Sequence, residues 1–195
     1  RYESSAASDV YKRQMINIAE EFDYKIAAFH HAVEAYKIAD LLADNNICAA
    51  LWADWWGFKH EAYDMSIANV AIVDQARNGQ GCAIVHSDSE NGIQRLNQEA
   101  AKALSAGREA GFEISDARAI TWLTKNPAIA AGILEQTGTI EIGKNADIVV
   151  WSGHPLSVYS KADQVYIDGA LTFDRLNNFM PHTDFDLGIE LWESE

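Results

Sequence analysis

Three short apolar runs that alternate with helical segments constrain the fold more than any other feature of this sequence. The runs cover residues 24–29, 47–52 and 82–86, and each is followed by a segment with helical spacing of its apolar residues. A strand without apolar and polar alternation is buried on both faces, as in a parallel sheet that helices cover. The strands lie roughly 20 to 35 residues apart, which is typical of βα units. The sequence therefore predicts an α/β fold.

The helical segments are predicted from the spacing of their apolar residues. The predicted helices cover residues 15–22, 32–43 and 68–78. The first of them has its apolar residues at Met15, Ile18, Ala19 and Phe22. The second ends at Ala43, because Asp44, Asn45 and Asn46 follow as a stop signal.

The pattern changes after Pro127 from helical periodicity to short alternating segments. Residues 138–143 alternate, residues 148–151 form a predicted strand, and residues 165–173 contain a predicted hairpin around Gly169. A small β unit therefore follows the α/β part. The predicted division is an α/β part over residues 15–134, a β-domain over residues 135–176 and a loosely docked acidic tail over residues 177–195.

The first fourteen residues, RYESSAASDVYKRQ, do not share the periodicity of the residues that follow. Residues 9–14 resemble the translated reading frame of a common transposon sequencing adapter. We expect residues 1–14 to be a non-native segment and exclude them from the prediction of the fold. The coding sequence is then expected to enter at or just before Met15, partway through a gene, so the cellular compartment is not predicted.

The negative net charge of the chain argues against nucleic acids and anionic membranes as ligands. The formal net charge is −14, which repels nucleic-acid backbones and anionic membrane surfaces. No uncharged apolar run reaches the roughly 18 residues of a membrane-spanning helix. A small-molecule substrate is therefore expected, with no nucleic-acid partner and no membrane span.

Cys48 and Cys82 lie in apolar runs without metal-ligand spacing, and we expect both to be buried free thiols.

Polar side chains follow each of the three predicted strands. His30 and His31 end the first, Asp54 follows the second, and His86 and Asp88 follow the third. The carboxyl ends of parallel strands meet at one edge of a sheet, which is the catalytic face of a (β/α)8 barrel. A His and an Asp on such ends can hold a cation such as zinc, although structural groups satisfied by neighbours give the same pattern.

Six motifs occur together in one order. They are F-H-H-A-V-E-A-Y-K-I-A-D-L-L at residues 29–42, D-W-W-G-F-K at 54–59, H-S-D-S at 86–89, R-L-N-Q-E-A-A-K at 95–102, T-K-N-P-A at 124–128 and G-T-I-E-I-G-K-N-A-D-I-V-V-W at 138–151. With these motifs the chain resembles the C-terminal half of the amidohydrolase superfamily, closest to imidazolonepropionase-like amidohydrolases. The resemblance covers roughly residues 15–175. It implies the C-terminal portion of a (β/α)8 TIM barrel, strands six to eight, followed by part of a small β-sandwich domain.

The resemblance also implies a site. His31 matches the histidine that ends strand six, at the metal or against the substrate, and Asp88 matches the aspartate that ends strand eight, which binds metal and accepts a proton from water. Both are therefore expected as catalytic residues and as ligands of one or two divalent ions, with zinc favoured. The implied reaction is hydrolysis of a carbon–nitrogen bond in a cyclic, non-peptide or dipeptide-like amide. Further ligands are expected upstream of Met15, so the chain by itself is expected to be inactive.

Several assignments stay open. A non-catalytic binding protein on the same fold, and a deaminase or deacetylase of the same superfamily, are the alternatives to an amidase. Homo-oligomerisation is also open. His30 competes with His31 for the site, and His86 stands where an asparagine is frequent.

Four residues are candidates for binding substrate, and each has a structural alternative. Trp55 and Trp56 lie on a loop at the catalytic face, where they either line a cleft or pack on a neighbouring loop. Glu34 and Lys37 lie three residues apart on a helix and either reach the cleft or form a solvated pair. Lys59 and His60 are ambiguous in the same way.

Overall fold

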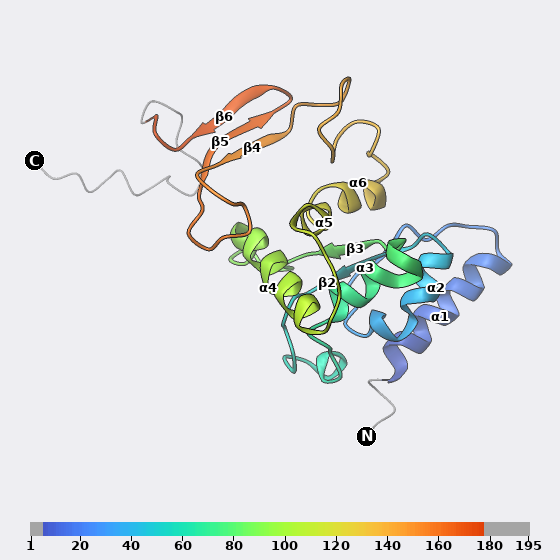
Figure 1. Ribbon diagram of the computed structural model, residues 1–195. Helices are drawn as coiled ribbons and strands as arrows, with labels where there is room; N and C mark the ends of the chain where they lie inside the picture. The colour runs from blue at the N-terminus through green and yellow to red at the C-terminus, as the bar shows by residue number, and fades with distance from the viewer. Residues whose placement is uncertain (1–5, 178–195) are drawn as a thin grey trace, which may run out of the picture.

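Two three-stranded sheets organise the structure, a computed structural model that describes residues 6–177 (Figure 1). The first sheet contains β1 (Ala28–Phe29), β2 (Cys48–Leu51) and β3 (Ala83–Val85) in that order. Both of its strand pairs are parallel. The predicted parallel sheet is therefore confirmed, and the chain has an α/β fold.

Helices separate the strands along the chain, as the sequence pattern predicts. They are η1 (Ala35–Ile38) and α2 (Ala39–Asp44), then η2 (His60–Ala62) and α3 (Asn69–Gly79), then η3 (Ile93–Arg95), α4 (Leu96–Glu109), α5 (Asp116–Thr121) and α6 (Lys125–Ala131). The segment predicted as one helix over residues 32–43 is thus a 3-10 turn followed by a short α-helix.

The pleat of β2 explains why its residues are apolar on both faces. Ala49 and Leu51 belong to the main core, which also contains buried residues of α2, α3 and α4. Cys48 and Ala50 belong to a second cluster on the other face, against which Ala130 of α6 packs. Successive side chains of a strand point to opposite faces, so both faces of this strand require an apolar sequence.

The first helix, α1 (Ala6–Glu21), runs through the predicted boundary at Met15. Ile16 and Ala19 are its buried core residues, whereas Met15, Ile18 and Phe22 are exposed. The predicted apolar face was therefore wrong except at Ala19: over residues 9–21, where the side chains are described, the helix contacts the core through Ile16 and Ala19. Residues 9–14 contribute no buried side chain.

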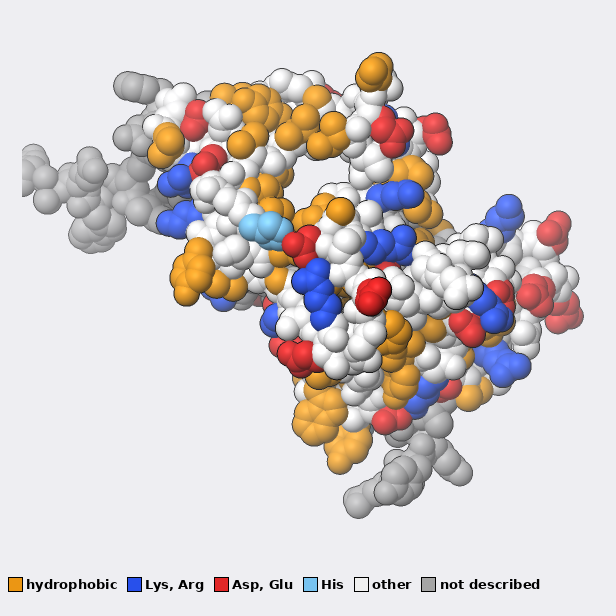
Figure 2. Space-filling model, viewed as in Figure 1, with side chains coloured by type: hydrophobic (Ala, Val, Ile, Leu, Met, Phe, Trp, Pro, Cys, Tyr) orange, Lys and Arg blue, Asp and Glu red, His pale blue; other side chains and the backbone are white. Residues whose placement is uncertain are grey.

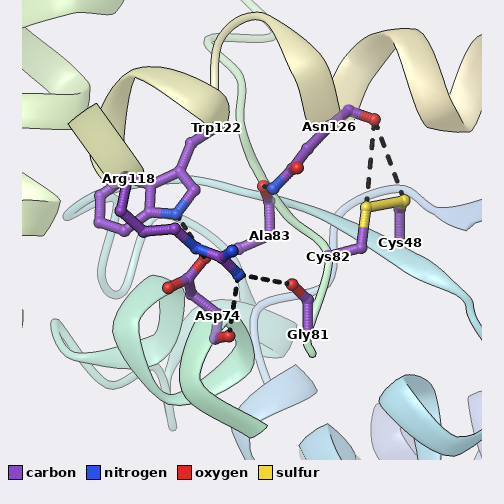
Figure 3. Close-up of a disulfide and its surroundings, with 8 residues drawn as sticks. All are labelled: Cys48, Asp74, Gly81, Cys82, Ala83, Arg118, Trp122 and Asn126. Carbon is purple, nitrogen blue, oxygen red and sulfur yellow. Dashed lines mark hydrogen bonds and ion pairs between the residues drawn. A yellow bond between two sulfur atoms is a disulfide. The ribbon is translucent and has the colours of Figure 1, made fainter. Parts of the chain in front are cut away.

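Cys48 and Cys82 form a disulfide, so the prediction of free thiols was wrong. Ala49 of β2 pairs with Ala83 of β3, which places the two preceding cysteines opposite each other with a Cα–Cα distance of 4.5 Å. Both sulfur atoms lie 4.0 Å from the carbonyl oxygen of Asn126 on α6 (Figure 3). The register between two parallel strands determined this contact, and sequence spacing does not report register.

A buried carboxylate joins α3 to the segment that contains α5. The Asp74 side chain is fully buried, and its Oδ1 accepts hydrogen bonds from Arg118 Nε and Trp122 Nε1, both at 2.8 Å (Figure 3). Arg118 also donates to the carbonyl oxygens of Gly79 at 2.9 Å and Gly81 at 3.2 Å. The guanidinium therefore closes the turn between α3 and β3.

The second sheet is antiparallel and contains β4 (Ile148–Trp151), β5 (Ala162–Ile167) and β6 (Ala170–Asp174). The predicted strand over residues 148–151 and the hairpin around Gly169 are confirmed. Residues 138–143, predicted to alternate as β structure, form no strand in the described chain.

Asp147 accepts hydrogen bonds from the Asp168 backbone N–H at 3.0 Å and from Thr137 Oγ1 at 2.7 Å, and both lower the pKa of its carboxyl.

The loop between β4 and β5 connects this sheet to the helices. Leu156 is buried in the main core, and Asn97 Nδ2 of α4 donates to the carbonyl oxygen of Pro155 at 2.8 Å. His154 Nε2 lies 3.0 Å from Asp116 Oδ2 at the start of α5. Figure 2 shows hydrophobic side chains gathered over the second sheet and charged side chains of both signs over the helices.

The predicted acidic tail lies outside the described residues, apart from Asn177. Within residues 6–177, no helix combines the length and the apolar character that crossing a membrane requires.

Replacing Arg118 by Met is expected to lower the free energy of unfolding by about 3 kcal/mol, because the buried Asp74 carboxylate loses its cationic partner. Urea denaturation measures this change. Arg77→Met is the matched control: Arg77 pairs with Asp40 and Asp44 at the surface, so its loss is expected to change stability little. Equal effects of the two variants would contradict the role given to the buried pair.

The double substitution Cys48→Ser and Cys82→Ser is expected to lower the free energy of unfolding by about 3–4 kcal/mol, because the disulfide closes a loop of 34 residues in the unfolded chain. Denaturation with and without a reducing agent measures the effect. The reducing agent should destabilise the parent protein and leave the double variant unchanged. A parent protein that is insensitive to reduction would show that the bond does not form.

Candidate active site

The carboxyl ends of the parallel strands bring His31 and Asp88 together. His31 follows β1, Asp88 follows β3, and His31 Nε2 lies 3.1 Å from Asp88 Oδ2. The two side chains are about half exposed, at 47% and 50%. The structure therefore places the two residues predicted as catalytic and metal-binding in direct contact at an open edge of the sheet.

His31 and Asp88 both have a positive φ angle, a backbone conformation that is uncommon for residues other than glycine. The φ angle is 53° at His31 and 50° at Asp88. The neighbouring backbone is held by the sheet: the Ala32 N–H donates to Ala50 at 3.1 Å, and the His86 N–H donates to Leu51 at 3.0 Å. Asp and His adopt this conformation more readily than most residues, and five other described non-glycine residues share it, so the contact between the two side chains is what distinguishes this edge.

His30, the competing histidine, does not contact Asp88. Its ring is exposed, and its centroid lies 6.4 Å from that of His86 in an edge-to-face arrangement. Both histidines lie beyond the end of β1, and the positive φ of His31 changes the direction of the chain there, so strand alternation does not decide between them. In the structure the histidine that contacts Asp88 is His31.

Trp52, which the sequence pattern does not indicate as a site residue, packs against the His31 ring. It lies directly after β2 and is buried, and its Nε1 donates to the Ser87 carbonyl oxygen at 3.0 Å. Its ring centroid lies 5.0 Å from His31 and 4.7 Å from His86. Trp52 was missed because a tryptophan at the end of an apolar run is indistinguishable from a core residue in the sequence.

His86 is partly buried beside the pair, with its ring against that of Trp52. Burial lowers the pKa of His86 to about 4, so the ring is neutral near pH 7. Its Nε2 is buried and has no hydrogen-bond partner among the described residues. The centroid of the His31 ring lies 6.0 Å away. A neutral imidazole with an unpaired nitrogen is therefore available within the site.

The two tryptophans predicted to bind substrate have different positions. Trp55 is partly buried and stacks on Trp52, with ring centroids 5.8 Å apart and an interplanar angle of 6°. Trp56 is 60% exposed and contacts Tyr63 at a centroid distance of 5.7 Å. Trp55 therefore belongs to the aromatic cluster next to His31, and Trp56 lies on the outer part of the loop.

Glu34 and Lys37, also predicted to bind substrate, form a network with the loop that contains the tryptophans. Glu34 is buried, which raises the pKa of its carboxyl, and Lys37 Nζ lies 2.9 Å from its Oε1. Lys37 also pairs with Asp64, whose carbonyl oxygen accepts a hydrogen bond from the Tyr36 hydroxyl at 2.9 Å. In the described chain, neither Glu34 nor Lys37 is hydrogen-bonded to His31 or Asp88.

Asp54, the polar residue after β2, is paired with a lysine. Lys102 Nζ of α4 lies 2.9 Å from both of its carboxylate oxygens and 2.8 Å from Glu99 Oε1. Its carboxylate is therefore already neutralised, unlike that of Asp88, whose partner is a histidine.

The residues present fit part of a metal site. A structural zinc has four ligands, and a catalytic zinc has three from the protein. Residues 6–177 contain no group of three His, Cys, Asp or Glu side chains that could hold an ion. His31 Nε2 and Asp88 Oδ2 converge and are both common ligand atoms, so this chain offers two ligands, and others would have to come from outside the described residues.

Comparisons with known proteins give one consistent result. The model of the "Amidohydrolase family" matches residues 68–176, just over half of the 195 residues. The chain is 32% identical over 165 residues to "Amidohydrolase tasK" of Hapsidospora irregularis, covering 82% of this chain and 16% of that protein. A shorter match, 48% identical over 40 residues, covers 20% of this chain and 10% of an imidazolonepropionase of Brucella suis.

Solved structures show the same relationship. An amidohydrolase from Thermotoga maritima is 33% identical with a TM-score of 0.69, over 83% of this chain and 40% of that one. A zinc-bound adenosine deaminase from Xanthomonas campestris has a TM-score of 0.65 over 90% of this chain and 43% of that one, and its 14% identity supports the fold alone. The chain thus spans about two fifths of the length of these structures.

Proposed function

Since this chain belongs to the amidohydrolase family, we propose that it supplies His31 and Asp88 to the active site of a hydrolase that cleaves a carbon–nitrogen bond. The observation that carries the proposal is the contact between these two side chains at the ends of β1 and β3. The carboxyl ends of parallel strands are the catalytic edge of α/β barrels. The net charge of −14 favours a small-molecule substrate over a nucleic acid.

The proposed architecture is the last part of a (β/α)8 barrel with a piece of a β-sandwich. In this proposal β1, β2 and β3 are barrel strands six, seven and eight, and the sheet of β4 to β6 is one part of the sandwich. The parallel order of the first sheet and the 40% share of the Thermotoga maritima structure support it. The remaining strands would then belong to a part of the protein outside this chain.

The proposed chemistry assigns each side chain one task. A divalent ion such as zinc, alone or as one of two, held by His31 and Asp88 with further ligands, would lower the pKa of water that it binds. The half-exposed Asp88 carboxylate is placed to accept a proton from the attacking water and to pass it to the leaving nitrogen. Trp52 holds the His31 ring in position by packing against it.

The substrate is proposed to lie against the loop that follows β2 and contains Trp55 and Trp56, here called the aromatic loop. Trp55 provides a flat apolar surface next to Trp52, and the exposed Trp56 would contact the substrate farther out on the same loop. Glu34 and Lys37 would affect substrate binding indirectly. Lys37 pairs with both Glu34 and Asp64, and these ion pairs hold the loop in place. A deaminase or a deacetylase would use the same residues, so a screen of amide, amidine and acetamide substrates separates these reactions.

Asp88→Asn is expected to lower kcat by several orders of magnitude in the full-length protein, because an amide cannot accept the proton. Steady-state kinetics on the substrate found in the screen measure the loss, and circular dichroism checks the fold. Glu113→Gln, on an exposed loop, is the charge-matched control and should leave kcat unchanged. Near-normal turnover by Asp88→Asn would refute its role as proton acceptor, whereas a parent protein that hydrolyses none of the screened substrates would favour a non-catalytic binding protein.

His31→Ala is expected to reduce turnover more than His30→Ala, because only His31 contacts Asp88 and the Trp52 ring. We expect at least a hundredfold difference in kcat between the two variants, on the order of a lost charge-assisted contact. The same kinetic assay compares them. The reverse order would mean that the residue facing the site is misplaced by one position.

A further inference from the structure

We propose that Lys59 binds a carboxylate of the substrate, which makes the substrate class of this site amides that carry a carboxylate, such as N-acyl amino acids or dipeptides. The inference rests on the proposed function for the reaction itself, and it adds the group by which the substrate is recognised. The aromatic loop after β2 places Lys59 at the same sheet edge as His31 and Asp88.

The Lys59 ammonium is in direct contact with the candidate pair. Its Nζ lies 3.2 Å from His31 Nδ1, while the other ring nitrogen of His31 faces Asp88 at 3.1 Å. A lysine ammonium has three donors and no acceptor. His31 Nδ1 accepts one of them while Nε2 carries the ring proton, and none when Nε2 binds a metal ion, because the ring proton is then on Nδ1. At least two donors of Lys59 therefore remain for a ligand that enters the site.

Lys59 differs from the other two lysines around the aromatic loop. Lys37 lies between the carboxylates of Glu34 and Asp64, and Lys102 lies between those of Asp54 and Glu99. Among the described side chains, which do not include that of Glu61, Lys59 has no carboxylate within ion-pair distance. The contacts of its ammonium are His31 Nδ1 and two aromatic rings, at the place where a substrate would arrive.

Aromatic rings define the surroundings of this ammonium. Lys59 Nζ lies 5.2 Å from the ring centroid of Trp52 and 5.3 Å from that of Phe58. Such contacts attract a cation to the ring faces, and the low polarity around the rings strengthens its attraction for an anion. Phe58 and Trp55 are edge to face at 5.5 Å, which leaves an apolar wall for the part of the substrate beside the carboxylate.

The position of Asp88 determines how a carboxylate would be oriented. Asp88 repels an anion, and it lies at the Nε2 edge of the His31 ring, whereas Lys59 lies at the Nδ1 edge. A substrate carboxylate is therefore directed to the Lys59 side. Only one imidazole ring separates the two contacts, so the carboxylate and the nitrogen of the scissile amide should be attached to the same carbon, as in an N-acyl α-amino acid.

Binding of a matched pair of probes to the metal-free full-length protein tests the inference without requiring turnover. The probes are N-acetyl-L-phenylalanine and N-acetyl-L-phenylalaninamide, which differ only in the negative charge, and calorimetry or quenching of tryptophan fluorescence gives Kd. We expect the acid to bind more tightly than the amide. Lys59→Met, which keeps the stem and removes the charge, should weaken binding of the acid about 10- to 100-fold and leave that of the amide nearly unchanged.

Two further variants make the test specific. Lys59→Arg should retain the preference for the acid, and Lys161→Met, an exposed lysine next to β5, should behave like the parent. Equal binding of both probes by the parent protein would overturn the inference. So would an equal loss of both probes in Lys59→Met with an unchanged circular dichroism spectrum, because Lys59 would then act through His31.

The same probes separate this inference from the proposed function. Selective binding of the acid without hydrolysis of any N-acyl amino acid, after addition of zinc, would support carboxylate recognition and contradict the hydrolase. Hydrolysis of amides with no preference for a carboxylate would support the hydrolase and contradict the role of Lys59.

Discussion

The arrangement of this molecule depends on the hydrogen bonds that the buried Asp74 carboxylate accepts. It is satisfied by Arg118 and Trp122 from the segment of α5, and Arg118 in turn binds the carbonyl oxygens at the end of the α3 to β3 turn. The chain is so close to α3 here that a side chain at Gly81 would collide with the Val73 carbonyl oxygen. This network aligns the start of β3, and therefore places Asp88 at the other end of the strand.

The candidate site follows from the alignment of three parallel strands. Because the strands are in register and point in one direction, the residues after β1, β2 and β3 meet at one edge, although His31 and Asp88 are far apart in sequence. The central strand contributes Trp52, which lies against both His31 and His86. A rigid aromatic ring in the middle of the edge limits the movement of the side chains on either side, as a preorganised site requires.

Charge around this edge is compensated unevenly. Lys37 and Lys102 are each neutralised by two carboxylates, and these ion pairs fix the aromatic loop and the start of α4. Asp88 and Lys59 instead contact the two nitrogens of one imidazole ring, and among the described side chains, which do not include that of Glu61, neither forms an ion pair with a lysine, arginine or carboxylate. In a chain with a net charge of −14, a cation on one side of this ring and a half-exposed carboxylate on the other form an arrangement that a polar substrate can use.

The sequence by itself determined the α/β class, the parallel sheet, the hairpin around Gly169 and the polar residues at the strand ends, among which the resemblance to the amidohydrolase superfamily selected His31 and Asp88. Patterns of period 2 and 3.6 and residues at strand ends are local properties, so they can be detected without a structure. Only the tertiary structure decided the Cys48–Cys82 disulfide, the buried face of α1, and the positions of Trp52 and Lys59. Each of these depends on strand register or on contacts between segments distant in the chain, which no local pattern contains.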